Sequence, residues 1–223
     1  MCGRYVSPTV AEAERNFTID LLLTHWQPSF NLAPTQLAPV IYRRGEQNVC
    51  DVMRFGMIPF FARGEAPKYS TINATVEKLE SGACWRGPWM RNQRALVLSN
   101  GFYEWQLLAD GKSKQPYFIK PADQDTFAFA GLWDASTAAD GTVVHSFAIL
   151  TLPASPLMAQ IHNVRQREPA ILAHAELATW LTGSAAQARA LLNPYADDLL
   201  NAHPVSTRVN SPKNNDASLV VAL

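Results

Sequence analysis

The stretch RALVLSNGFYEWQLL, residues 94–108, decides the fold class of this chain. Its first half is a short apolar run and its second half is rich in aromatic residues, so each half predicts a β-strand. With a period of two, Phe102 and Glu104 share one face of the second strand, and Tyr103 lies on the other. The turn residues at 109–111 (ADG) then predict a hairpin that leads into a further strand at PYFIK, residues 116–120.

Further strands are predicted on both sides of this stretch. QLAPVIYR (36–43) and NVCDVMRF (48–55) flank a turn that contains Gly45, and this pattern is typical of a hairpin. FAFAGLW (127–133) and VVHSFAILTL (143–152) are apolar runs of strand length. Because these strands follow one another closely and several are joined by short turns, we expect them to pair mostly antiparallel.

The helical patterns are short. Thr9 and Glu12 have the spacing of a capping box, which predicts a helix that runs to about residue 17. HAELATWLTG (174–183) and SAAQARALL (184–192) predict two more. We find no repeat and no flexible stretch long enough to separate domains. The sequence therefore predicts an α+β fold with a single domain over residues 1–223, mainly antiparallel β in a barrel-like mixed sheet with short peripheral helices.

Composition excludes several classes of protein. The chain has 223 residues, 48% of them hydrophobic, so it can bury a core. Its net charge is zero, so the overall charge does not indicate binding to a polyanion such as nucleic acid. Three cysteines and five histidines show no metal-ligand spacing, so we expect neither a metal nor a cofactor. No apolar run approaches the ~20 residues of a membrane helix, and the first ten residues lack the features of a signal peptide. We expect a cytoplasmic protein without membrane contact.

Cys2 follows the initiator methionine directly. Once Met1 is removed, it carries a free α-amine and a thiol on adjacent carbons. An α-amine has a reference pKa of ~7.7–8.0, so a useful fraction is neutral and nucleophilic at pH 7, whereas lysine at ~10.4 is almost wholly protonated. Such an amine forms a Schiff base with an aldehyde, and the thiol can then close a five-membered thiazolidine ring. The alternative is an accidental cysteine that stays behind Met1.

Glu104 lies in the middle of the aromatic strand FYEWQ. A carboxylate beside such bulky groups loses hydration, which raises its pKa and suits it to proton transfer near neutral pH. The alternative is that this face of the strand is exposed to solvent and Glu104 is simply hydrated.

Two further residues can carry chemistry. Asn73, in STINATVE (70–77), can orient a sugar hydroxyl or a carbinolamine through its amide, although the residue type alone favours a turn. His162 follows a short segment that Ser155-Pro156 starts as a helix, and an imidazole at a helix end can act as an acid or base at pH 7. The alternative for His162 is a structural or exposed histidine.

A second group of residues suits nucleic-acid contact. MIPFF (57–61) places Phe60 and Phe61 after a proline, in a predicted turn, and two adjacent rings cannot both enter one core face. Exposed rings beside Arg54 would suit stacking of bases together with phosphate contact. Arg165 and Arg167 can also meet a phosphate. The alternative is core packing of the rings with solvated basic neighbours.

The order of these motifs along the chain is more specific than any one of them. The matching segments are MCGRY (1–5), FNLAPT (30–35), RFGMIP (54–59), INATVE (72–77), SNGFYEW (99–105), QPYFI (115–119), AGLWD (130–134), IHN (161–163) and HPVSTRVNSPKNN (203–215). In this combination the sequence resembles the SOS response-associated peptidase (SRAP) family, whose members shield abasic sites in single-stranded DNA by covalent attachment.

The resemblance implies a role for each residue of the candidate site. The trimmed Cys2 would capture the ring-opened aldehyde of the abasic sugar, which makes a DNA–protein crosslink with lyase-like chemistry. Asn73 and Glu104 match the positions that hold the sugar and shuttle protons. His162 matches the histidine of the active-site loop and would be a second acid or base.

The resemblance also implies the partner. This would be single-stranded DNA that contains abasic sites, faced by Arg4 and by the Phe60–Phe61 pair, with no obligate protein partner. The expected location is then cytoplasmic, with nucleoid association when the protein is bound to DNA. Removal of Met1 by the protein itself is part of the same expectation.

Two differences from the family pattern limit how far the family's residue roles apply to this chain. The family usually has an arginine two residues after the active-site asparagine, where this chain has Thr75, so one phosphate contact is missing. The family also runs from its histidine to a proline through a short segment, whereas here NVRQRE separates His162 from Pro169. In this longer loop His162 can be displaced, or Arg167 can stand in for the family arginine.

Three functions follow, in order of preference. The first is covalent capture of abasic sites in single-stranded DNA through Cys2. The second is a thiol peptidase, with Cys2 as nucleophile and His162 as base, whose activity can be confined to its own first residue. The third is a divergent, non-covalent module that binds single-stranded DNA.

Overall fold

The computed structural model describes residues 2–223, and the predicted removal of Met1 lies outside them. The strands are β1 (Tyr5–Val6), β2 (Leu21–Leu22), β3 (Leu37–Arg44), β4 (Gln47–Phe55), β5 (Asn73–Thr75), β6 (Arg94–Ser99), β7 (Gly101–Leu107), β8 (Lys114–Pro121), β9 (Phe127–Thr137), β10 (Val143–Pro153), β11 (Arg167–Pro169), β12 (Ile171–Leu172) and β13 (Leu200–Pro204). The α-helices are α1 (Val10–Asn16), α2 (Arg86–Met90), α3 (Pro156–Ile161), α4 (Leu177–Thr182) and α5 (Ala185–Ala190). Short 3₁₀ helices cover Phe60–Ala62, Val76–Lys78, His174–Glu176, Asp197–Leu199, Thr207–Asn210 and Ala217–Val220.

Five strands close into a barrel. β10, β4, β3, β6 and β9 are hydrogen-bonded in that order, and β9 pairs back onto β10. All of these pairs are antiparallel except β4 with β10, which run parallel from Arg54 beside Ser146. Closure satisfies the backbone of what would otherwise be two exposed edge strands. The predicted α+β class, with a barrel-like mixed sheet and short helices, is confirmed.

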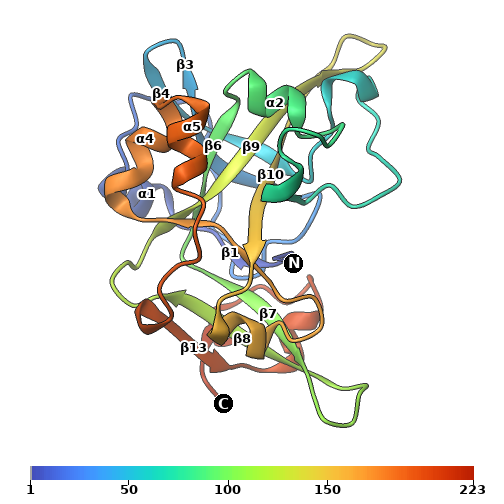
Figure 1. Cartoon of the computed structure of the whole chain (residues 1–223), viewed down its shortest axis with the longest axis vertical. Helices are drawn as coiled ribbons and strands as arrows, with labels where there is room; N and C mark the ends of the chain where they lie inside the picture. The colour runs from blue at the N-terminus through green and yellow to red at the C-terminus, as the bar shows by residue number, and fades with distance from the viewer. Residues whose placement is uncertain (1) are drawn as a thin grey trace.

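A second, four-stranded antiparallel sheet has the order β1-β7-β8-β13. It lies below the barrel in Figure 1, and the N-terminal end of the described chain lies between the two. The stretch 94–108 therefore supplies one strand to each sheet, β6 to the barrel and β7 to the second sheet. Gly101 makes this change of direction at φ 153°, and a Cβ there would lie 2.1 Å from the ring of Phe118. Only glycine fits this junction.

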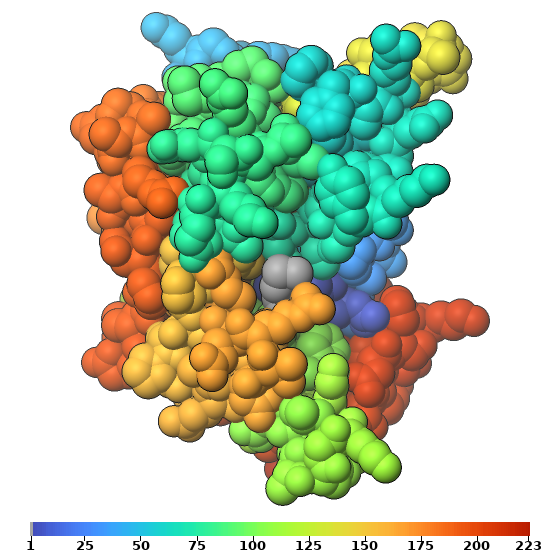
Figure 2. Space-filling model, turned by 45° about the vertical axis from the view of Figure 1, so that its right-hand side comes forward, coloured from blue at the N-terminus to red at the C-terminus, as the bar shows by residue number. Residues whose placement is uncertain are grey.

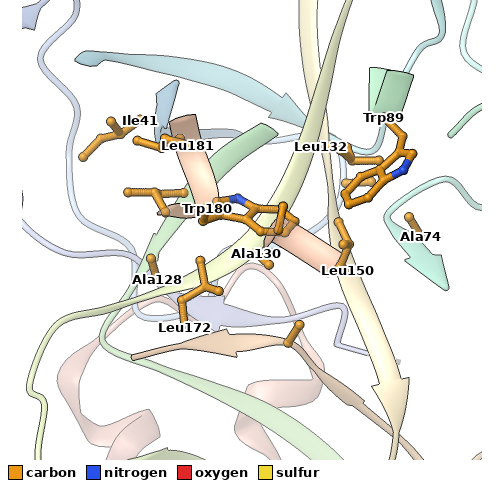
Figure 3. Packing of buried hydrophobic residues seen from close by; sticks show 14 of the residues in the cluster. Ile41, Ala74, Trp89, Ala128, Ala130, Leu132, Leu150, Leu172, Trp180 and Leu181 are labelled. Atoms are coloured by element: carbon orange, nitrogen blue, oxygen red, sulfur yellow. The ribbon is translucent and has the colours of Figure 1, made fainter. Parts of the chain in front are cut away.

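Helix α4 covers one side of the barrel. Trp180 is fully buried among the aliphatic side chains shown in Figure 3, and its indole Nε1 donates a hydrogen bond to the Ala95 carbonyl at 3.0 Å. At ~25 cal/mol per Å² over a side chain of ~150–250 Å², this burial stabilises the fold by about 4–6 kcal/mol. The packing of Trp180 thus holds α4 against the barrel.

Most predicted elements are confirmed. The capping box of Thr9 and Glu12 begins α1, and the hairpin around Gly45 is formed by β3 and β4. The preference for a turn at Asn73 is wrong, because this residue begins β5, which pairs parallel with β10. A strand of three residues has too short a pattern for its sequence to reveal it. The single-domain boundary at 1–223 stays a prediction.

Within residues 2–223, no helix has the length and apolar character needed to cross a bilayer.

Candidate functional site

Four residues from distant parts of the chain meet between the barrel and the second sheet. Cys2 precedes β1, Asn73 begins β5, Glu104 lies in β7 and His162 follows α3. Their exposed fractions are 0%, 7%, 2% and 6%, respectively, so all four are buried. The sequence prediction named each of them separately. The fold brings them together.

Asn73 is held beside the N-terminal segment by the pairing of β5 with β10. Its amide Nδ2 donates to the carbonyl oxygen of Cys2 at 3.2 Å and to that of Ile149 at 3.5 Å. Its Oδ1 is buried and has no hydrogen-bond partner among residues 2–223. A buried acceptor without a donor is costly, which is typical of a group kept for a ligand. Asn73 therefore presents an acceptor that a sugar hydroxyl or a carbinolamine can use.

The Cys2 thiol is fully buried, and this burial favours its protonated form. Burial raises its pKa well above the ordinary value, and the negative charge of Glu104 raises it further. The Sγ atom lies 3.9 Å from the Arg4 carbonyl oxygen, and this contact opposes the rise. Cys2 is thus close enough to Glu104 to sense its charge, and its thiol does not exist as a free thiolate at neutral pH.

His162 and Glu104 form the proton-handling part of the site. Helix α3 has Ser155 as its N-cap and His162 as its C-cap. The Nδ1 atom of His162 lies 2.8 Å from the Arg167 carbonyl, which can only accept, so Nδ1 carries a proton. The other ring nitrogen, Nε2, lies 3.8 Å from Oε2 of Glu104. Nε2 is therefore the ring atom that can take or give a proton next to this carboxylate.

A family model described as SOS response associated peptidase (SRAP) matches residues 1–212.

The chain belongs to the SRAP family.

Curated relatives agree with this assignment. The chain is 36% identical over 228 residues to "Abasic site processing protein YoaM" of Bacillus subtilis, covering 100% of this chain and 98% of the relative. It is 30% identical to "Abasic site processing protein HMCES" of Xenopus tropicalis, covering 89% of this chain and 67% of the relative. A crystal structure of a protein from Bacteroides thetaiotaomicron superposes with a TM-score of 0.84 at 25% identity, covering 100% of both chains.

In this SRAP chain both predicted aromatic residues are exposed. Phe60 and Phe61 lie in a 3₁₀ helix after Pro59, with exposed fractions of 55% and 49%. Their ring centroids are 5.6 Å apart in an edge-to-face arrangement. The alternative that both rings enter the core is therefore wrong, and stacking of bases on them stays a prediction.

Two of the predicted arginines are engaged within the protein. Arg4 is half-buried, and its Nη1 donates to Asn31 Oδ1 and to the Val209 carbonyl, at 2.9 Å each. Arg167 makes a bidentate ion pair with Glu77, at 2.7 and 3.0 Å, so its charge is balanced. These contacts give both arginines a structural role, and neither side chain is held out toward solvent.

The other two predicted arginines differ in setting. Arg54 is half-buried in β4 and donates to the Gly56 carbonyl, whereas Arg165 is exposed in the turn after α3. The longer loop has not displaced His162, because this residue lies against Glu104. DNA contact by Arg54 and Arg165 stays a prediction.

Sequence reasoning missed two kinds of residue near the site. Tyr5 is fully buried with its hydroxyl unpaired among residues 2–223, and burial, followed by the nearby Cys2, raises its pKa well above normal. Arg91 lies with its guanidinium 5.2 Å from the centre of the Phe60 ring. The motif MCGRY could have indicated Tyr5, whereas no local pattern indicates Arg91.

Proposed function

We propose that this protein captures abasic sites in single-stranded DNA covalently, through the amine and thiol of Cys2 after Met1 has been removed. The observation that carries the proposal is the burial of Cys2 beside Asn73 and the Glu104–His162 pair. Relatives named abasic site processing proteins support the choice of substrate.

The chemistry balances with the groups at this site. The amine nitrogen attacks the aldehyde carbon of the ring-opened sugar and gives a carbinolamine. Glu104 or His162 protonates the hydroxyl, which leaves as water, and a Schiff base remains. The thiol sulfur then adds to the imine carbon, and its proton passes through Glu104 to the ring nitrogen. The products are one thiazolidine and one water molecule.

The order of these steps follows from the state of the thiol. Because burial and Glu104 keep the Cys2 thiol protonated, the amine is the better first nucleophile. A thiol peptidase needs a thiolate next to its base, and the raised pKa of Cys2 disfavours this form. The raised pKa of the Cys2 thiol therefore supports capture of an aldehyde better than peptide hydrolysis in trans.

The test is adduct formation on an oligonucleotide with one abasic site, read on a denaturing gel. We expect a denaturation-resistant adduct with the wild type and none with Cys2→Ala. Cys2→Ala and Cys2→Ser both keep the α-amine but lack the thiol, so we expect each to form a Schiff base that survives only after borohydride reduction. Intact mass must show that Met1 is absent from each sample.

The outcomes separate the three functions. Equal adduct yields from the wild type and Cys2→Ala would refute capture by Cys2. Cleavage of peptides in trans by the trimmed wild type would favour the peptidase. Binding of single strands without any adduct would favour the non-covalent module.

A further inference from the structure

Tyr5 is a buried tyrosine whose hydroxyl has no hydrogen-bond partner among residues 2–223. Figure 2 shows the N-terminal segment, in dark blue, where it reaches the surface near the middle of the face in view. Tyr5 itself has an exposed fraction of 0%, so bulk water does not reach its hydroxyl. An unpaired buried hydroxyl is costly, and phenylalanine would fill the same space without this cost. The hydroxyl therefore calls for a role other than packing.

Several elements hold the Tyr5 ring in place. β1 pairs with β7, with Tyr5 opposite Phe102, and the Tyr5 backbone exchanges hydrogen bonds with Leu32 at 3.3 and 2.9 Å. The ring packs edge to face on Phe55 and on Phe129, with centroids 5.6 and 5.9 Å apart. These neighbours restrict the direction in which the hydroxyl points. Tyr5 is thus a preorganised donor without an acceptor in this state.

The hydroxyl lies near the Cys2 thiol. Cys2 and Tyr5 belong to the same buried cluster, and both have an exposed fraction of 0%. Burial raises the pKa of Tyr5 most, and the nearby Cys2 raises it further. Tyr5 is therefore close enough to sense charge on the sulfur, and its hydroxyl keeps its proton at neutral pH.

The Cys2 sulfur lacks a donor that could stabilise a negative charge. Its Sγ lies 3.9 Å from the Arg4 carbonyl oxygen, which can only accept, and among residues 2–223 no N–H or O–H group donates to it. Ring closure in the proposed capture reaction places negative charge on the sulfur as the thiol loses its proton. Burial and the charge of Glu104 both oppose this. A preorganised donor in a site without water is an effective way to stabilise such a charge.

We propose that Tyr5 is a further catalytic residue, whose hydroxyl donates a hydrogen bond to Sγ of Cys2 when the sulfur leaves the Arg4 carbonyl and adds to the imine carbon. The inference rests on the proposed function, since ring closure is one of its steps. In this step the C–S bond forms, the electron pair of the C=N bond moves to nitrogen, and the thiol proton reaches that nitrogen through Glu104. The Tyr5 proton stays on its oxygen, so the step needs no co-reactant.

The test compares Tyr5→Phe with Tyr103→Phe in single turnovers on an oligonucleotide with one abasic site. Tyr103 is also fully buried, but its hydroxyl donates to the Phe30 carbonyl at 2.8 Å. Samples quenched with and without borohydride distinguish the Schiff base from the thiazolidine. Tyr5→Phe should form the Schiff base at the wild-type rate and close the ring about 10- to 100-fold more slowly, as expected for loss of one hydrogen bond to a charged group. Tyr103→Phe should close the ring at the wild-type rate.

Thermal unfolding should change in opposite directions in the two variants. Tyr5→Phe loses no hydrogen bond and removes an unpaired buried hydroxyl, so its midpoint should rise by about 2–12 °C. Tyr103→Phe loses a bond and leaves the Phe30 carbonyl without this donor, so its midpoint should fall. A purely structural role of Tyr5 would change the midpoint and leave the rate of ring closure as it is.

A second measurement does not depend on DNA. Alkylation of Cys2 by iodoacetamide, read from the mass of the N-terminal peptide, reports how readily the thiolate forms. At the same pH, Tyr5→Phe should be alkylated about 10-fold more slowly than the wild type, because the thiolate has lost its donor. Tyr103→Phe should be alkylated at the wild-type rate.

These results separate the inference from the proposed function. Ring closure or alkylation at the wild-type rate in Tyr5→Phe would overturn the inference, while adduct formation by the wild type would still support covalent capture. If the wild type forms no adduct, the proposed function fails. Slower alkylation of Tyr5→Phe would then still support a hydrogen bond from Tyr5 to the sulfur.

Discussion

Replacement of Asn73 by alanine should slow adduct formation while changing the free energy of unfolding only slightly. The side chain donates two hydrogen bonds, to Cys2 O and Ile149 O, and their net contribution is about 1–3 kcal/mol. It also buries Oδ1 without a partner among residues 2–223, which costs about 1–3 kcal/mol. These terms have opposite signs and similar size. We therefore expect Asn73→Ala to change the free energy of unfolding by less than ~2 kcal/mol.

Asn31 provides the matched control. It is 1% exposed, and its amide is fully used. Its Nδ2 donates to the carbonyls of Val209, Ser211 and Asn214 at 3.2, 3.0 and 2.9 Å, and its Oδ1 accepts from Arg4 at 2.9 Å. At about 0.5–1.5 kcal/mol each, loss of these four bonds by Asn31→Ala should cost roughly 2–6 kcal/mol.

The assay combines thermal unfolding with single-turnover adduct formation. For a chain of this size ~1 kcal/mol shifts the midpoint by about 2–4 °C, so Asn73→Ala should shift it by less than about 8 °C and Asn31→Ala by clearly more. Adduct formation by Asn73→Ala should be slowed at least about 10-fold, because the reacting sugar loses a positioning group. If Asn73→Ala unfolds as early as Asn31→Ala, or forms the adduct at the wild-type rate, this reasoning is refuted.

Three further predictions concern the neighbours of the site. Glu104→Gln should slow adduct formation by about 10²–10⁴-fold, as expected for loss of an acid–base group. It should also speed alkylation of Cys2 by iodoacetamide, because the charge that raises the pKa of the thiol is gone; an unchanged alkylation rate would argue against this coupling. Glu168 is buried and its pKa is raised from 4.5, so its neutral form stabilises the fold at low pH and this stability is lost as the pH rises through the raised pKa. In urea denaturation, Glu168→Gln should therefore gain stability relative to the wild type between pH 4 and pH 7, and a constant difference would contradict this. Arg167→Ala should lower the free energy of unfolding by about 1–2 kcal/mol, because the Glu77 partner is half exposed, and should leave affinity for single-stranded DNA within about 2-fold; a large loss of affinity would show that Arg167 contacts DNA.

The sequence predicts the barrel strands well because their signals are local. The run RALVLSN and the Gly45 hairpin contain their own periodicity and turn residues, and the structure places β6, β3 and β4 there. The parallel pairing of β4 with β10 is not local. It joins Arg54 to Ser146, far apart in the chain, and no turn signal specifies it. The sequence therefore predicts a barrel-like sheet but not the strand pair through which the barrel closes.

Some residues of the candidate site could likewise be predicted from local sequence, and others could not. The chemistry of Cys2 and Glu104 follows from residue type and neighbours, and the structure confirms that Glu104 is buried rather than hydrated. The position of Asn73 depends on β5, whose three residues pair with β10, a strand far along the chain. Arg91 gave no signal, because its contact with the Phe60 ring exists only once the Phe60 segment has folded against it.

Cys2 is buried by segments of the chain that are synthesised long after it. The site is completed by His162, about 160 residues after Cys2, and translation at ~5–20 residues per second needs roughly 8–30 s to cover that distance. During this interval the start of the nascent chain has no partner to enclose it, and a trimming enzyme can reach it. The proposed function needs a free amine at Cys2, and the order of synthesis gives a trimming enzyme access to Met1 before His162 has been made.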